Sequence, residues 1–264
     1  MIIQNIKAMT LASHKPALHL AALLFCSNMF TSVLQASSLS EIRALTYNES
    51  PHQADTLSSS ELIVTLHPLS TKSIAENNYR QALIYIEQND VNTAQSTLWQ
   101  ALRQDNTNIL ARELLVSLLL TQNNFKAAIS VLETGIAVTP THSKFPLWLA
   151  QTHIKLGAFE RALTVLEKNI TRFRQQSTYL GALANFYQQN ERHNDARDYY
   201  LQALKLTPQD NRWWIGLGMT AEELNDWSGA QTAYQRAKEN SFMDDPLLPF
   251  VQQRLSMMRT QLQQ

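Results

Sequence analysis

The chain has 264 residues, with 22 Lys plus Arg against 22 Asp plus Glu, six Gly, eight Pro and one cysteine, Cys26. This length allows one or two domains with a sizeable core, and the scarcity of Gly and Pro favours an all-α protein. The balanced charge excludes a global field that would attract nucleic acid or an anionic membrane, and a single cysteine excludes a disulfide framework and a Cys-based zinc site.

Residues 1–36 have the pattern of an export segment. Lys7 and Lys15 lie in a stretch without acidic residues, and residues 16–40 contain no Asp, Glu, Lys or Arg. A basic region followed by an apolar one, with Leu34-Gln35-Ala36 as a cleavage site, is typical of a signal peptide. Residues 17–34 are also long enough for an uncleaved inner-membrane anchor, and both interpretations predict that the rest of the chain is periplasmic. A buried cytosolic helix is the third interpretation.

Residues 37–74 are predicted to form an extended linker, because they are rich in Ser, contain Pro51 and Pro68, and show no helical periodicity. Within them, Glu61 to Leu66 is a short β-prone run. This run could add a strand to a partner's sheet, or it could serve as a tether that packs on the first repeat.

From residue 75 onward the sequence repeats with a constant period, equal to the interval from Ala94 to Ala128. An alanine recurs at this step in every repeat, at Ala94, Ala128, Ala162, Ala196 and Ala230. A large apolar column keeps the same step, at Leu98, Leu132, Leu166, Tyr200 and Tyr234. The last repeat carries Trp214, Leu217 and Gly218, followed by Ala230 and Tyr234. Small residues allow two helices to approach closely, and large ones fill the space to the next hairpin.

The W-x2-L-G and A-x3-Y spacing resembles the tetratricopeptide repeat (TPR) family. The resemblance implies an all-α solenoid, a right-handed superhelix of helix-turn-helix repeats. The five repeats would be residues 75–108, 109–142, 143–176, 177–210 and 211–244. After them, residues 245–264 are predicted to form a C-terminal capping helix, since Leu248, Val251, Leu255, Met258 and Leu262 are spaced by three or four.

The sequence carries no catalytic signature. It has no G-x-S-x-G, no Gly-rich phosphate loop and no H-E-x-x-H, and its seven His are scattered. His153 and His193 fall in repeat columns, which favours structural roles. We therefore predict a protein that is not an enzyme, with no cofactor and no metal.

In the TPR family, partners bind in a groove lined by outward positions of each first helix, the second, fifth, ninth, twelfth and thirteenth of a repeat. The resemblance places the following residues in such a groove: Leu110, Glu113, Ser117, Leu120, Leu147, Gln151, Ile154, Lys155, Asn185, Gln188, Arg212, Ile215, Met219 and Glu222. Because six of them are apolar, the predicted partner is an amphipathic helix or extended segment of another protein. The alternative is that tighter stacking of the repeats buries some of these side chains.

Residues 205–256, together with the export segment, linker and five hairpins, resemble the TPR proteins of mannose-sensitive haemagglutinin (type IV) pilus biogenesis. This resemblance implies a periplasmic scaffold, associated with the inner membrane, whose partners are pilus or secretion components. A generic exported adaptor or chaperone is the main alternative. A helical-repeat RNA binder is a third, but it would require a basic groove and a cytosolic location.

Overall fold

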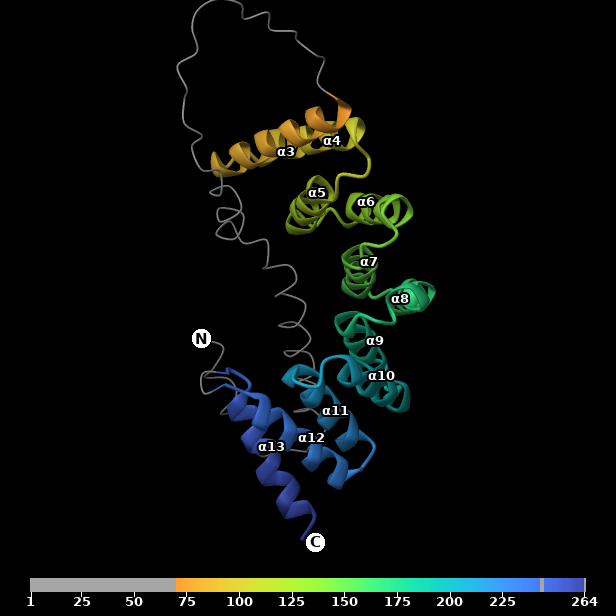
Figure 1. Ribbon diagram of the computed structural model, residues 1–264, viewed down its shortest axis with the longest axis vertical. Coiled ribbons are helices and arrows are strands. Elements are labelled where there is room, and N and C mark those ends of the chain that lie inside the picture. The colour runs from red at the N-terminus through yellow and green to blue at the C-terminus, as the bar shows by residue number, and fades with distance from the viewer. Residues whose placement is uncertain (1–69, 243–244, 264) are drawn as a thin grey trace, which may run out of the picture. The chain divides into compact units, whose positions relative to one another are not determined.

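The structure, a computed structural model, describes residues 70–242 and 245–263. Within these ranges the chain forms eleven helices and no strand, so the prediction of an all-α fold is confirmed (Figure 1). The predicted export segment, most of the linker and the β-prone run Glu61 to Leu66 lie outside the described residues. No helix of the described ranges is long and apolar enough to cross a membrane.

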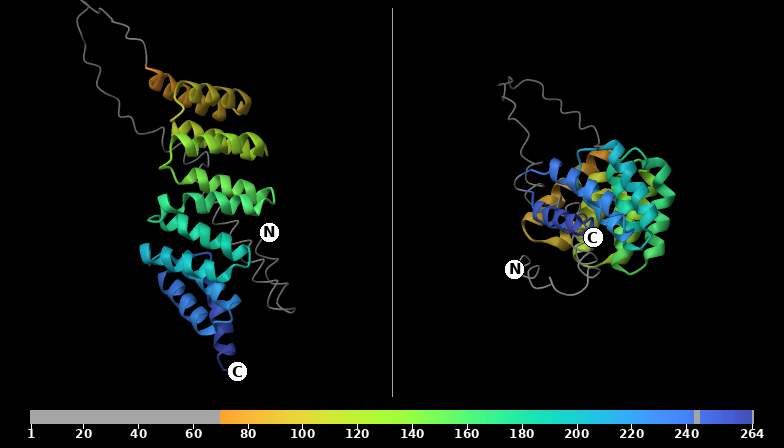
Figure 2. Two further views of the ribbon diagram at one scale, coloured as in Figure 1. Left: turned by 90° about the vertical axis from the view of Figure 1, so that its right-hand side faces the viewer. Right: turned by 90° about the horizontal axis from the view of Figure 1, so that it is seen from below.

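The described residues divide into two compact units, with the boundary between Thr152 and His153. The first unit holds α3 (Thr71–Glu87), α4 (Val91–Gln104), α5 (Ile109–Thr121), α6 (Phe125–Val138) and most of α7 (Lys144–Lys155). The second holds the end of α7 and α8 (Phe159–Phe173), α9 (Ser177–Gln189), α10 (His193–Leu206), α11 (Asn211–Glu223), α12 (Trp227–Asn240) and α13 (Leu248–Gln261). Figure 2 shows the helices of a hairpin, such as α3 and α4, running antiparallel and side by side.

The first helix begins earlier than the repeat period predicts. α3 begins at Thr71 rather than at residue 75, because the side chain of Ser70 caps it by accepting a hydrogen bond from the backbone N–H of Ser73 at 3.1 Å. The end of the predicted linker, residues 71–74, is therefore helical. The sequence carried this signal, since Ser70 is a good N-cap residue immediately before the helical pattern.

Each hairpin turns through one residue in the left-handed backbone region. In residues 70–242 and 245–263, the five residues with positive φ are Asn89, Asn123, Gly157, Glu191 and Asn225, with φ between 57° and 69°. They are spaced by one repeat period, so the same position of each repeat makes the turn. The next residue caps the second helix in three of the five hairpins, where Asp90, Asn124 and Asp226 accept hydrogen bonds from backbone N–H groups.

The alanine column lies at the centre of the packing. All five alanines, Ala94, Ala128, Ala162, Ala196 and Ala230, are 0% exposed. A methyl group at this position lets the second helix of a hairpin approach its neighbours closely, as the repeat pattern predicts.

The C-terminal helix α13 covers the end of the second unit. Val251, Leu255 and Met258 of α13 share one buried cluster with Tyr234 of α12 and Ile215 of α11, and Trp214 and Trp227 pack against its edge. The helical part of the tail therefore serves as the predicted cap, over Leu248–Gln261.

Candidate functional site

The predicted groove residues of the first unit differ widely in exposure. Leu110, on the first turn of α5, is 47% exposed, and Ser117 and Gln151 are half-buried. By contrast, Leu120 and Leu147 are buried. The surface that these positions offer is therefore mostly Leu110 with polar neighbours, rather than a continuous apolar stripe.

Glu113 of the same helix is already held by two basic side chains. Its Oε1 lies 2.7 Å from Nε2 of His142, which precedes α7, and 3.1 Å from Nζ of Lys144, the first residue of α7. Burial alone would raise the pKa of the Glu113 carboxyl, but the hydrogen bonds from His142 and Lys144 outweigh it and lower the pKa. Glu113 is thus an ionised and paired carboxylate, which fixes the start of α7 against α5.

In the second unit, the predicted groove residues fall into two groups. Lys155 is exposed, and Ile154 and Arg212 are half-buried. The other five are buried: Asn185, Gln188, Ile215, Met219 and Glu222. Ile215 and Met219 belong to the cluster that α13 completes. The expectation that they form an open apolar surface is wrong here, because the capping helix supplies their contacts.

The twelfth position of a repeat faces the second helix of its own hairpin. The hydroxyl of Tyr200 donates a hydrogen bond to Oε1 of Gln188 at 3.0 Å, and the hydroxyl of Tyr234 donates to Oε1 of Glu222 at 2.5 Å. These two pairs are equivalent, one repeat period apart. The three earlier repeats hold apolar pairs at the same positions: Ile86 with Leu98, Leu120 with Leu132, and Ile154 with Leu166. A polar residue at the twelfth position thus accompanies a tyrosine at the twenty-fourth in the fourth and fifth repeats.

Glu222 has a second partner, Arg254 of α13. Nε of Arg254 donates to Oε1 of Glu222 at 2.9 Å, and Nη2 contacts Oε2. Both side chains are buried, and burial lowers the pKa of the Arg254 guanidinium to about 10, so it remains charged at neutral pH. This ion pair links α13 to α11 and occupies a carboxylate that the sequence assigned to partner binding.

Trp213 is a residue whose role the sequence did not show. Its ring is buried against Gly181, so closely that a Cβ added at Gly181 would overlap it. Gly181 is at the fifth position of its repeat, one of the positions assigned to the groove. In the sequence, a glycine at the fifth position followed by a tryptophan at the third position of the next repeat could have indicated this contact.

In the part of the chain that the structure describes, no group of three or more His, Cys, Asp or Glu is placed to hold a metal ion. Among the predicted groove residues, only a few side chains in each unit remain accessible. They include Leu110 in the first unit, and Lys155 and Arg212 in the second.

Two family models of the tetratricopeptide repeat match the sequence, one over residues 85–144 and again over 119–186, the other over 182–243. Together they run from residue 85 to residue 243, more than half of the chain. The chain belongs to the tetratricopeptide repeat family. Proteins of this family are generally non-enzymatic scaffolds that bind peptides or other proteins.

Solved TPR structures share the fold. MamA from Desulfovibrio magneticus RS-1 matches with a TM-score of 0.53 and 16% identity, over 65% of this chain and 97% of its own. YrrB, described as a TPR protein with an unusual peptide-binding site, matches with a TM-score of 0.52 and 16% identity, over 70% and 97%. Yeast Tom70 has a TM-score of 0.60 and 17% identity, over 72% of this chain and 40% of its own. No curated protein matches the sequence.

Proposed function

We propose that this TPR protein is a non-enzymatic periplasmic scaffold that binds protein segments during assembly of a type IV, mannose-sensitive-haemagglutinin-like pilus. Membership of the TPR family supports the binding of a protein segment. The export pattern of residues 1–36 supports a periplasmic location, with or without an inner-membrane anchor at residues 17–34. The resemblance of residues 205–256 to MshN, the TPR protein of that pilus system, supports the choice of pilus components as partners.

The observation that carries the binding role is the exposure of Leu110 on a first helix of the stack. Leu110 is 47% exposed, whereas most of the other apolar side chains at the predicted groove positions are buried. It lies one turn from the Glu113 carboxylate, which is fixed by His142 and Lys144. An apolar contact beside a fixed polar one is what an amphipathic segment requires.

The test is the substitution Leu110→Glu, compared with Leu201→Glu. Leu201 is also exposed, at 41%, but lies on α10, the second helix of its hairpin. A glutamate at residue 110 is compatible with the fold, because an acidic residue in the first turn of a helix is favourable. In pull-downs from envelope fractions, we expect Leu110→Glu to weaken capture of pilus components by roughly tenfold, since an apolar contact is lost and a charge is buried. Leu201→Glu should capture them like the wild type.

Cells with Leu110→Glu should also carry fewer surface pili at normal protein levels, which electron microscopy would measure. Unchanged capture and wild-type piliation would contradict binding through α5. If the wild type captures envelope proteins but no pilus component, the generic exported adaptor replaces the pilus scaffold.

A further inference from the structure

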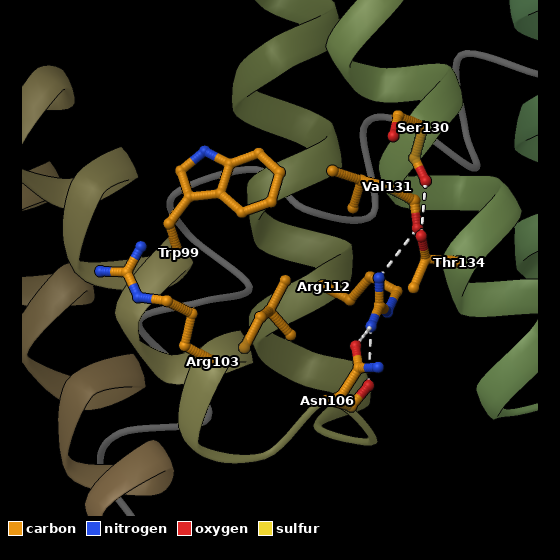
Figure 3. A pocket seen from close by; sticks show the side chains of 8 residues that line it. Trp99, Arg103, Asn106, Arg112, Ser130, Val131 and Thr134 are labelled. Atoms are coloured by element: carbon orange, nitrogen blue, oxygen red, sulfur yellow. Dashed lines mark hydrogen bonds between the residues drawn. The ribbon is translucent and has the colours of Figure 1, made fainter.

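A pocket lies between α4, α5 and α6 of the first unit, on a different set of residues from the predicted groove. It has a volume of about 130 Å³ and is lined by Trp99, Leu102, Arg103, Asn106, Arg112, Ser130, Val131 and Thr134 (Figure 3). The rim is exposed: Trp99 is 36% exposed, and Arg103, Ser130 and Thr134 are exposed as well. The floor is formed by the buried Leu102, Val131 and Arg112.

Arg112 takes the place of a signature tryptophan. It stands at the fourth position of its repeat, where the last repeat has Trp214. Nε1 of Trp214 donates a hydrogen bond to the carbonyl of Pro208 at 2.8 Å, and Nη2 of Arg112 donates to the equivalent carbonyl, that of Asn106, at 2.6 Å. The arginine therefore keeps the structural contact of the tryptophan, but it adds a positive charge.

The charge of Arg112 is buried without a carboxylate partner. The side chain is 2% exposed, and its acceptors are neutral: the carbonyls of Val131 and Asn106 and the amide oxygen of Asn106. Its Nε–H, also buried, has no acceptor. No carboxylate among the described residues forms an ion pair with Arg112 or Arg103. By contrast, Arg254, which is also buried, is paired with Glu222.

A buried charge is costly unless an opposite charge pairs with it, and a guanidinium can form two parallel hydrogen bonds with a planar carboxylate. We propose that this pocket binds the side-chain carboxylate of a glutamate or aspartate from a partner protein. The carboxylate neutralises Arg112, and Leu102, Val131 and the Trp99 ring contact the methylene groups behind it. The lining carries two arginines and no acidic residue, so its charge complements such a ligand. A volume of about 130 Å³ is close to that of engineered cavities that hold benzene, so it accepts one short side chain and excludes a larger anion such as a nucleotide.

The probe is N-acetyl-glutamate N-methylamide, titrated into the full-length protein labelled with ¹⁵N-arginine. We expect the Nε–Hε signal of Arg112 to shift and to saturate with a Kd on the order of 1 mM, as befits a ligand of this size. The signal is assigned by its absence in Arg112→Gln. The glutamine analogue should cause no shift. The absence of a saturating shift with the glutamate probe, or an equal shift with the glutamine analogue, would overturn the proposal.

Because Arg112→Gln could disturb the fold, the site is also tested from its rim. Ser130→Tyr places a ring at the pocket mouth and leaves Arg112 intact. Thr164→Tyr is the matched control, at the same position one repeat later and also exposed. We expect Ser130→Tyr to weaken binding about tenfold or more and Thr164→Tyr to change it less than about twofold. Equal binding by both variants would place the probe elsewhere. Acetate distinguishes the source of the carboxylate: acetate binding as tightly as the glutamate probe would overturn the assignment to a side chain.

Discussion

At the scale of single residues, the turn of each hairpin requires one residue in the left-handed backbone conformation. The residue at the fifteenth position has φ near 60° in every repeat, where a Cβ approaches the following carbonyl oxygen. Asn89, Asn123 and Asn225 tolerate this conformation well, and Gly157 has no Cβ. Glu191 has neither advantage, so the fourth repeat contains a strained turn that the others avoid.

Replacing Glu191 by Asn should therefore stabilise the protein. We expect a gain of about 0.5–1 kcal/mol, because asparagine enters the left-handed region at lower cost than glutamate. For a chain of this size, that corresponds to a rise of roughly 1–4 °C in the midpoint of thermal unfolding. The reciprocal change, Asn225→Glu, should lower the midpoint by a similar amount. If the two substitutions shift the midpoint in the same direction, the left-handed turn does not explain the choice of residue.

Residue identity alone could not reveal how Arg112 is used. The repeat period places it at the position of Trp214, so its structural place was readable from the sequence. Its acceptors were not, because two of the three are the backbone carbonyls of Asn106 and Val131, which every residue type carries; the third is the amide oxygen of Asn106. The pocket beside it depends on side-chain volumes from three helices, and a periodic pattern does not report these volumes.

At the scale of elements, the sequence predicts which helix faces pack against each other. It predicts less well which helix faces remain exposed to solvent. The alanine column and the large apolar column follow from the period, since the two helices of every hairpin pack on each other and on the next hairpin in the same way. The groove positions depend on what lies beyond the hairpin. Ile215 and Met219 are covered because α13 packs on the end of the second unit, and Gly181 is covered by Trp213 of the next repeat.

The alanine column gives a direct test of helix packing. Ala196→Leu in α10, or Ala162→Leu in α8, inserts three carbon atoms at a position with 0% exposure. The surrounding helices have to move, and we expect a loss of about 1–3 kcal/mol in the free energy of unfolding. Gln202→Leu is the control on α10, because residue 202 is exposed and a leucine there displaces nothing. Denaturant unfolding should rank the alanine substitutions as the more harmful. The opposite ranking would contradict the repeat register.

At the scale of the whole molecule, the repeats do not determine where the protein works. TPR solenoids from different proteins share this fold at 15–17% identity, so the fold leaves location and partner open. The prediction of a periplasmic location rests on residues 1–36, whose charge pattern is independent of the repeat period. The predicted partner likewise rests on the resemblance of residues 205–256, together with the overall domain order, to a pilus protein.

Export can be measured separately from binding. Alkaline phosphatase folds to its active form only where its disulfides form, outside the cytoplasm. We place the junction after residue 69, before the Ser70 cap of α3, so that the fusion contains the whole predicted export segment and no repeat helix. The fusion should be active, and a matched fusion that lacks residues 1–36 should be inactive at equal protein levels. Replacing Leu23, Leu24 and Phe25 by Lys, Glu and Lys should abolish activity as well, since an export segment needs its apolar region. An inactive fusion that contains the whole of 1–69, alongside a working cytosolic reporter at the same junction, would remove the periplasmic proposal and with it the pilus scaffold.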